Sequence, residues 1–461
     1  MRTTTLVLPE TIARQLRGML AERRESAAVL LAGVARARDG QLRLLGRELH
    51  PVPDDCYERR ERTELIVVAD GWVPALGRAA EIGASAIWFH THPGVDANPK
   101  PSARDRGVDE QLADPFRIRS GSELYGSLIF AGTPEHVRFS GRVLDGGQSP
   151  KIERLWEVGD RLRLTDARPD ATMVDSGLFD RNVRAFGGGV QETLSSLSVG
   201  LVGAGGTGSA VAEQLIRLGV RRLSVIDPDT LSVSNLTRVY GSTPGDVGQS
   251  KARVLATHLR RIAPDAEVQA IVGTLTEERT ARELVGCDVV FGCTDDNAGR
   301  LVLSRAASYL LTAVIDCGVL LSSGAGGALT GIDARVTVLT PGAACLVCRE
   351  RIDLKRAQSE LLSVGERSRL QQEGYAAALP GVEPAVVAFT TAAAAAAVGE
   401  LIERLVGYGQ EPTPSEVLLR LHDREVSVNR AAPRQGHYCD PSTGKLGLGE
   451  GEPFLEQTWT S

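Results

Sequence analysis

The chain has 461 residues, of which 42% are hydrophobic, so it is long enough to bury the cores of more than one domain. Its net charge is −6 with acidic and basic residues interspersed, which excludes the basic surface that non-specific nucleic-acid binding requires. The seven cysteines are scattered and odd in number, and no stretch has the pattern of a signal peptide or the length of a membrane crossing. We therefore expect a cytoplasmic protein whose partners are small proteins or nucleotides, with no nucleic acid and no membrane.

The first 145 residues mix helical and extended patterns, as a mixed α/β domain does. Short helices are expected at 10–22 and 72–82, and strands at 27–31, 42–45, 65–68 and 85–89. The last of these strands runs directly into the sequence HTHPG.

Two histidines at the end of that strand have the spacing of ligands to one metal ion. His90 and His92 alternate with Thr91, so on an extended backbone both imidazoles point to the same side. Asp105 opens the next expected helix and offers a carboxylate as a third ligand. Three protein ligands leave one position open for water, which is typical of catalytic zinc. The alternative is a pair of ordinary polar residues at a strand end.

This cluster resembles the JAB/JAMM metalloprotease motif, in which His-x-His-Pro is followed by a serine and, three residues later, an aspartate. The matching positions are His90, His92, Pro93, Ser102 and Asp105, with a segment before Ser102 that is two residues longer than the usual pattern. The resemblance implies a mixed-sheet JAB/MPN-like fold over most of residues 1–145, a bound zinc, cleavage of peptide or isopeptide bonds, and a catalytic Ser102. Glu25, just before the strand, matches the family's general base best, and Glu22 is the alternative. A domain that only binds ubiquitin-like folds is the non-catalytic reading.

Residues 146–175 contain many Gly, Pro, Asp and Ser residues, and we expect a linker there around a short helical piece at 152–164. A second domain is then expected at 176–430, followed by a C-terminal tail at 431–461.

The clearest pattern of the chain lies at 197–229, where strand, glycine turn, helix and strand follow one another and end on an aspartate. The turn places backbone N–H groups where they can approach a phosphate, and it contains Gly203, Gly205, Gly206 and Gly208. The helix that follows points its positive end at the same anion. Asp227 is placed to accept hydrogen bonds from ribose hydroxyls. This unit alone would also suit a dinucleotide-dependent dehydrogenase.

The residues downstream change that interpretation. They are SNLTR at 234–238, Lys251, and CTDDNAGR at 293–300 after a short apolar run. This ordered set resembles the ThiF/MoeB and ubiquitin-activating-enzyme superfamily of adenylyltransferases, which implies a Rossmann-like, doubly wound α/β domain that binds ATP and Mg²⁺. Arg238 and Lys251 would neutralise the phosphates, and Asn235 would make a neutral hydrogen bond nearby. Asp295 would hold Mg²⁺, with Asp296 as the neighbouring alternative.

Two arginines before the glycine turn are candidates for a contact with a partner subunit. In the resembled family an arginine of this segment reaches the nucleotide phosphates of the partner, which implies a homodimer. Arg181 fits best and Arg184 is the alternative, although either is equally well explained as a solvated helix charge.

Cys345 and Cys348 form a CxxC pair, which in a cytoplasmic protein indicates zinc or redox chemistry. No second CxxC follows, so His437 and Cys439 in GHYC are the plausible completion within the tail. Because the family resemblance includes a structural zinc held by two CxxC pairs, we expect a variant Cys₃His site. Two buried thiols without a metal are the alternative.

In many members of the resembled family, the region after the CxxC carries a cysteine that takes over the acyl group as a thioester. Here no cysteine lies between Arg349 and Tyr438. Cys317 could be proposed instead, but core packing explains it better. The sequence therefore supports adenylation without supporting thioester transfer.

These patterns predict a bifunctional enzyme of a ubiquitin-like protein pathway. One domain would adenylate the C-terminus of a ubiquitin-like or sulfur-carrier protein, and the other would cleave bonds after the same kind of tail, with a conjugating enzyme as a further partner. The alternatives are carrier processing and activation in sulfur-transfer biosynthesis, a non-catalytic scaffold that binds ubiquitin-like proteins, and an NAD-dependent dehydrogenase.

Overall fold

The computed structural model describes residues 3–95, 97–167, 177–323, 329–362 and 385–459. The chain divides into two compact units. The first contains Met1–Ala171, Tyr309–Leu311 and Gly444–Gly451, and the second contains Thr172–Ser308, Thr312–Thr443 and Glu452–Ser461. Among the described residues, none of the helices combines the length and the hydrophobicity that a membrane span needs.

The first unit is built on an eight-stranded mixed sheet in the order β10-β9-β1-β3-β2-β6-β7-β8. Its strands are β1 (Thr4–Pro9), β2 (Ala27–Arg36), β3 (Leu42–Pro51), β6 (Ser85–Pro93), β7 (Tyr125–Gly132), β8 (Val137–Leu144), β9 (Ile152–Val158) and β10 (Leu162–Asp166). Its helices are α1 (Glu10–Met19), α2 (Val73–Ile82) and α3 (Ala103–Ser120). A separate hairpin joins β4 (Tyr57–Arg60) to β5 (Leu65–Val67).

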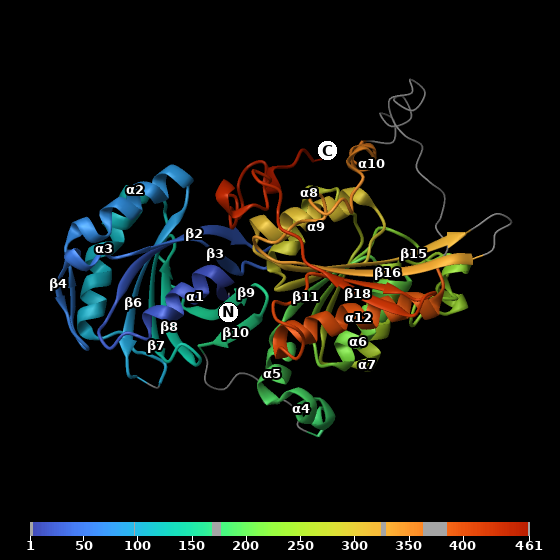
Figure 1. The fold of residues 1–461 in the computed structure, drawn as a ribbon, viewed down its shortest axis with the longest axis horizontal. Helices are drawn as coiled ribbons and strands as arrows, with labels where there is room; N and C mark the ends of the chain where they lie inside the picture. Colours follow the sequence, from blue (N-terminus) through green and yellow to red (C-terminus); the bar gives the residue numbers. More distant parts are fainter. Residues whose placement is uncertain (1–2, 96, 168–176, 324–328, 363–384, 460–461) are drawn as a thin grey trace. The chain divides into compact units, whose positions relative to one another are not determined.

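Both faces of this sheet are buried. Alternate residues of β2 enter different cores, because successive side chains of a strand point to opposite faces. Leu30 packs with α1 on one face, and Val29 and Leu31 pack with α2 and α3 on the other. Figure 1 shows α1 on one side of the sheet and α2 and α3 on the other.

The structure corrects the expected helical piece at 152–164. These residues form the strands β9 and β10, and β9 pairs in parallel with β1. Six of the seven residues of β9 are buried, including Arg154 and Glu157, so the strand shows neither the alternation of a half-exposed strand nor a plain apolar run. The strand therefore has no hydrophobic periodicity by which the sequence could indicate it. The sheet therefore extends to Asp166, through half of the segment expected to be a linker, whose residues 168–175 lie outside the described ranges.

The second unit also contains an eight-stranded sheet, in the order β13-β12-β11-β14-β15-β16-β17-β18. Its strands are β11 (Ser198–Val202), β12 (Arg222–Ile226), β13 (Glu267–Ile271), β14 (Val289–Gly292), β15 (Ala313–Ser323), β16 (Leu329–Leu339), β17 (Glu416–Arg420) and β18 (Glu425–Asn429). Its helices are α4 (Asp180–Phe186), α5 (Gly188–Ser196), α6 (Gly206–Arg217), α7 (Lys251–Ile262), α8 (Glu278–Ala281), α9 (Asn297–Tyr309), α10 (Leu354–Glu360) and α12 (Val387–Val406).

The five strands β11 to β15 are parallel and the last three pairs are antiparallel. Helices α6, α7 and α12 lie on one face of this sheet, and α8 and α9 lie on the other (Figure 1). The strand order reverses between β11 and β14. In open parallel sheets, ligands bind at such a switch point, outside the carboxyl ends of the strands.

The tail at 431–461 was expected to be one segment, but it divides between the two units. Gly444–Gly451 belongs to the first unit, where the Glu450 amide donates to the Val34 carbonyl at 2.9 Å. The second half of β2 is open to such a neighbour, because the pairing of β2 with β6 ends at Ala32. A Cβ at Gly33 would lie 1.9 Å from the Gly447 oxygen, so a glycine is required at this crossing.

Candidate functional site

The glycine turn joins β11 to α6 at the switch point of the second sheet. Gly203 has φ +95°, and a Cβ there would lie 2.5 Å from the Cys293 oxygen. A Cβ at Gly208 would lie 1.8 Å from the Gly203 oxygen, so Gly208 allows the helix to pack closely on the turn. Gly205 faces open space. The first turn of α6, whose N–H groups have no partner within the helix, therefore opens onto the space beyond the strands.

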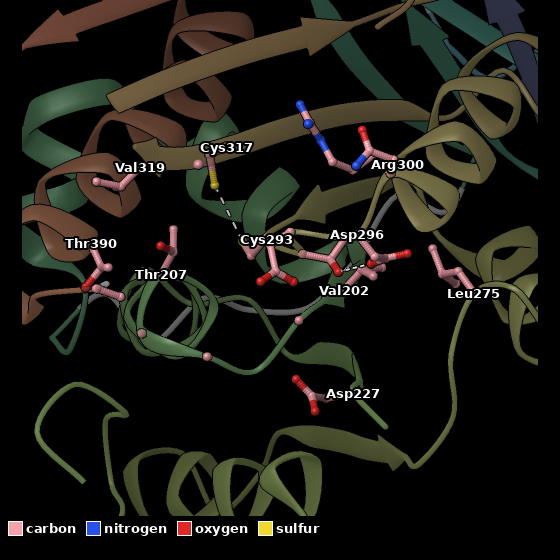
Figure 2. Close-up of a pocket in the computed structure, with 18 of the residues that line it drawn as sticks. Val202, Thr207, Asp227, Leu275, Cys293, Asp296, Arg300, Cys317, Val319 and Thr390 are labelled. Atoms are coloured by element: carbon pink, nitrogen blue, oxygen red, sulfur yellow. Dashed lines mark hydrogen bonds between the residues drawn. The ribbon is translucent and has the colours of Figure 1, made fainter. Parts of the chain in front are cut away.

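That space is a cavity of about 1440 Å³ (Figure 2). Seven of the residues that the sequence singled out line it: Gly203, Gly205, Gly206, Asp227, Arg238, Lys251 and Asp295. The structure thus brings together residues that are up to 92 positions apart in the chain, from Gly203 to Asp295.

Asp227 directly follows β12 and is almost fully buried. One carboxylate oxygen accepts from the Ala204 amide at 2.6 Å and the other from the Asp229 amide at 2.8 Å. Burial raises the pKa of Asp227 despite these two hydrogen bonds. The carboxylate ties the glycine turn to the end of β12 and forms part of the cavity wall.

Two cations line the cavity near the turn. The Lys251 ammonium lies 2.8 Å from an Asp229 carboxylate oxygen, and its side chain is 14% exposed. Arg238 donates to the Ser234 carbonyl at 2.9 Å. Asn235 is buried, accepts from the Ser232 amide at 3.0 Å, and is not among the residues that line the cavity. Its side chain completes the capping box of the short turn Val233–Asn235, and its carbonyl accepts from the Arg238 amide at 3.0 Å.

The two neighbouring aspartates after β14 have different environments. Asp296 accepts from the Gly299 amide at the start of α9 and from the Thr294 hydroxyl, and burial raises its pKa. Asp295 is exposed at the cavity. The carboxylate of Asp296 is thus engaged in capping a helix, whereas Asp295 is exposed and lines the cavity.

Sequence reasoning assigned Cys317 to core packing and gave no role to Cys293. Both residues line the cavity, and their sulfur atoms lie 3.5 Å apart (Figure 2). Cys293 directly follows β14, and Cys317 lies within the neighbouring parallel strand β15, each one position past the pair Gly292 and Asp316. No motif in the sequence indicates this pairing.

Arg181 lies on α4, is exposed, and is not among the residues that line the cavity. Arg184 is also exposed and pairs with Asp180 at 2.9 Å. The structure therefore does not bring either arginine to the cavity of its own chain.

The first unit brings the predicted histidines and aspartate together at the end of β6 and the start of α3. The Nε2 atoms of His90 and His92 are 3.2 Å apart, and they lie 3.4 and 3.7 Å from the two oxygens of Asp105. Ligands at about 2.0–2.2 Å around a tetrahedral ion lie roughly 3.3–3.6 Å apart. The donor atoms are thus spaced to fit one zinc ion.

The electrostatics of this cluster reflect its burial. Burial alone would raise the pKa of Asp105, but hydrogen bonds from His90 and Ser102 hold it well below its usual range. Burial lowers the pKa of His92. Burial also raises the pKa of Glu25 to about 7, with the charge of His90 opposing the rise.

Glu25 and Glu22 occupy different positions. A Glu25 oxygen lies 4.0 Å from His92 Nε2, and Glu25 is 8% exposed. Glu22 is half exposed and pairs with Arg60 at 2.6 Å. Ser102 caps α3: its hydroxyl accepts from the Asp105 amide at 3.1 Å, and its own amide donates to the Asp105 carboxylate at 2.6 Å. This capping box fixes the carboxylate next to the histidines.

A second group of side chains that could hold a metal ion lies in the second unit, formed by Cys345, Cys348, His437 and Cys439. His437 Nδ1 lies 3.3–3.6 Å from the three sulfur atoms, and the Cys348 and Cys439 sulfurs are 3.6 Å apart. Around a tetrahedral zinc, sulfur and nitrogen ligands at about 2.3 and 2.0 Å are separated by roughly 3.5–3.8 Å. The four residues therefore fit a structural zinc site.

Replacing Cys439 with alanine is expected to remove one zinc per chain and to lower the melting temperature by about 5 °C or more, because structural zinc binding contributes directly to folding free energy. The measurement is zinc content by elemental analysis with a thermal melt of the same sample. Cys56→Ala is the control, since Cys56 lies outside both metal-binding clusters. Unchanged zinc content in the Cys439 variant would contradict the assignment.

Comparison with known families identifies this architecture. The model of the ThiF family matches residues 179–440, which is more than half of the chain. The chain belongs to the ThiF family. The match covers the whole cavity and the cluster of Cys345, Cys348, His437 and Cys439.

Several curated proteins are similar over this region. The molybdopterin-synthase adenylyltransferase of Escherichia coli is 30% identical over 172 residues, 37% of this chain and 65% of that protein. The sulfur carrier protein adenylyltransferase of Thermus thermophilus is 38% identical over 26% of this chain and 44% of that protein. The ubiquitin-like modifier-activating enzyme 5 of Oryza sativa is 28% identical over 45% of this chain and 49% of that protein.

The chain spans about half the length of the Oryza sativa and Thermus thermophilus relatives. Among solved structures, Escherichia coli MccB with ATP is 16% identical, with a TM-score of 0.45 over 57% of this chain and 74% of that chain.

Proposed function

We propose that the second unit adenylates the C-terminal carboxylate of a ubiquitin-like or sulfur-carrier protein with ATP. The observation that carries the proposal is the cavity at the switch point, where the glycine turn, two cations and an exposed carboxylate meet. No group specific for nicotinamide is apparent among the lining residues. Membership in the ThiF family and the names of the curated relatives point to the same reaction.

In this reaction an oxygen of the carrier carboxylate attacks the α-phosphorus of ATP. A new oxygen–phosphorus bond forms, the bond from the α-phosphorus to the bridging oxygen breaks, and pyrophosphate leaves with the electron pair. Lys251 and Arg238 would offset the charge that develops on the departing pyrophosphate. Asp295 would hold Mg²⁺, which supplies further charge neutralisation when bound. Asp227 fixes the turn against which the nucleotide would lie.

The test is carrier-dependent exchange of labelled pyrophosphate into ATP. A candidate carrier can be captured by pull-down in the presence of ATP and then added to the purified enzyme. Exchange that requires the carrier supports adenylation, and tight binding of NAD without exchange would contradict it.

The carrier belongs to one of two pathways. Conjugation would require a conjugating enzyme as a further partner, whereas sulfur-transfer biosynthesis would use the adenylate directly. The curated relatives include both kinds of enzyme, a ubiquitin-like modifier-activating enzyme and a sulfur carrier protein adenylyltransferase. In either case we infer a cytoplasmic homodimer in which Arg181, exposed and outside the cavity of its own chain, reaches the phosphates bound by the partner.

We also propose that the first unit is a zinc-dependent peptidase of the JAB/JAMM type. His90, His92 and Asp105 would hold the metal, which activates water for hydrolysis when bound. Glu25, buried beside His92, would act as the general base, and Ser102 would fix Asp105 through the capping box. Its substrate would be a peptide or isopeptide bond that follows the small-residue tail of the same carrier.

The product of the second unit is expected to be the adenylate, with no thioester on this chain. No cysteine lies between Arg349 and Tyr438, and residues 363–384 of this region lie outside the described structure. Intact-mass analysis after reaction with carrier and ATP should show no covalent adduct. A thiol-sensitive adduct that disappears in Cys317→Ser would contradict this expectation, because Cys317 is a cysteine of the cavity wall.

A further inference from the structure

We propose that Arg60, on the hairpin β4–β5, is a positioning residue that fixes Glu25 for catalysis by the first unit. The inference rests on the peptidase activity proposed above and extends it to residues outside the metal cluster. Arg60 is only 13% exposed in its side chain although it lies on a short two-stranded hairpin.

The hairpin holds the peptide groups on both sides of Glu25. The Glu25 amide donates to the Glu61 carbonyl at 2.8 Å, and Arg60 Nε donates to the Glu25 carbonyl at 3.0 Å. With both backbone groups bonded to adjacent residues of one hairpin, Glu25 cannot shift without breaking these bonds. The position of its carboxylate near His92 therefore depends on the hairpin.

The next two residues of the chain are held by the same hairpin. Arg60 Nη2 donates to the Ser26 hydroxyl at 2.6 Å. The Ala27 amide donates to the Tyr57 hydroxyl at 3.0 Å, and the Arg60 guanidinium stacks on the Tyr57 ring at 4.7 Å. One arginine thus joins the hairpin to the start of β2 through a planar fork of donors.

The geometry of that fork is itself fixed. Arg60 also pairs with Glu22 at 2.6 Å and with Asp54 at 2.9 Å, so all three nitrogens of its guanidinium are engaged. A lysine has one nitrogen on a flexible stem and cannot reproduce these contacts. The two acids compensate the charge of Arg60 and leave its Nε directed at the Glu25 carbonyl.

The residue that precedes β2 is bonded in turn to the strand end that carries His90 and His92. The Ser26 amide donates to the Thr91 hydroxyl at 2.9 Å, and the Thr91 amide donates to the Ser26 carbonyl at 3.0 Å. Thr91 lies between His90 and His92. The distance from Glu25 to the histidines is therefore set by a short series of hydrogen bonds that begins at Arg60.

The tip of the same hairpin contacts the other segments that carry the cluster. Glu64 accepts from Arg104, the residue before Asp105, at 2.5 Å. A Cβ at Gly94, which follows the HTHP sequence, would lie 2.9 Å from Arg62 Nη2. The hairpin therefore contacts the residues just before β2, the loop after the histidines and the start of α3. This arrangement is expected of an element that fixes the parts of a catalytic site relative to one another.

The test compares Arg60→Met and Arg60→Lys with Arg59→Met, using the full chain loaded with zinc. Arg59 is the matched control, because it is 55% exposed, lies on the same strand, and contacts Glu64 rather than Glu25. The substrate is a fusion whose cleavable bond follows the tail of the captured carrier. Zinc content and hydrogen exchange of the Glu25 and Ser26 amides are measured on each variant.

A misplacement of about 1 Å of a catalytic group costs on the order of a hundredfold in rate. We expect Arg60→Met to lower kcat by about that factor with KM and zinc content unchanged, and to speed exchange at Glu25 and Ser26. Arg60→Lys should recover only part of the loss, and Arg59→Met should behave as the wild-type protein.

Two results would overturn the inference while leaving the peptidase proposal intact. One is cleavage by Arg60→Met at the wild-type rate, and the other is a loss of kcat matched by an equal loss of zinc. If the wild-type protein itself cleaves no such fusion, the peptidase proposal fails and the catalytic role of Arg60 fails with it.

Discussion

Replacing Asp295 or Lys251 with alanine is expected to lower carrier-dependent ATP–pyrophosphate exchange by about a hundredfold or more. Each residue presents a charge to the cavity beside the glycine turn. Removing one charged contact that stabilises a transition state in such a site costs about 3 kcal/mol. The loss should appear in kcat, because the charge on the departing pyrophosphate develops only as the bond breaks.

The chain offers matched controls for this experiment. Arg253 lies two residues beyond Lys251 on α7 and is exposed, so Arg253→Ala should retain exchange. His90→Ala should also retain it, because His90 belongs to the metal cluster of the first unit. Exchange at the wild-type rate in Asp295→Ala would show that this carboxylate does not hold the cation.

The second large effect is expected at Glu25. Glu25→Gln should lower cleavage of a carrier fusion by about 10²–10⁴-fold, since this is the usual contribution of a general base. Zinc content should stay unchanged, because the metal-binding cluster consists of His90, His92 and Asp105 without Glu25. The measurement is the cleavage rate together with zinc analysis.

Glu110→Gln is the matched control, because Glu110 is an exposed carboxylate on α3 away from the start of the helix. His90→Ala should lose both the zinc and the cleavage. Normal cleavage by Glu25→Gln would mean that another group takes the proton.

The sequence was most informative where the chemistry lies within a short segment. Local residue spacing predicts three features: the glycine turn, the two histidines with Asp105, and the CxxC. In the structure these segments form the cavity wall, one three-residue cluster, and half of a four-residue cluster. His437 and Cys439 could be added to the CxxC pair because so few candidates remained in the tail.

Features that depend on distant pairing could not be predicted in this way. Strand β9 pairs with β1, which lies more than 140 residues earlier in the sequence. Its buried Arg154 and Glu157 conceal the pattern of apolar residues that would indicate a buried strand. The attachment of Gly444–Gly451 to β2 joins opposite ends of the chain and depends on an open position beside Val34. Only tertiary structure shows which strands lack a neighbour.

The same reason explains why the sequence left alternatives open at the candidate sites. The sequence left Glu25 and Glu22 open as the base, and it also left Asp295 and Asp296 open. In each pair, one residue is engaged elsewhere: Glu22 pairs with Arg60, and Asp296 caps α9. The contacts of Arg60 with the start of β2 depend on long-range folding and have no local motif.

The central claim is that this ThiF-family chain activates a carrier by adenylation. The most direct measurement is the intact mass of the captured carrier after incubation with the enzyme, ATP and Mg²⁺. We predict a carrier whose mass has increased by one adenylyl group at its C-terminus, formed by the wild-type protein and not by Asp295→Ala. A carrier of unchanged mass, with ATP neither consumed nor exchanged with pyrophosphate, would contradict the account.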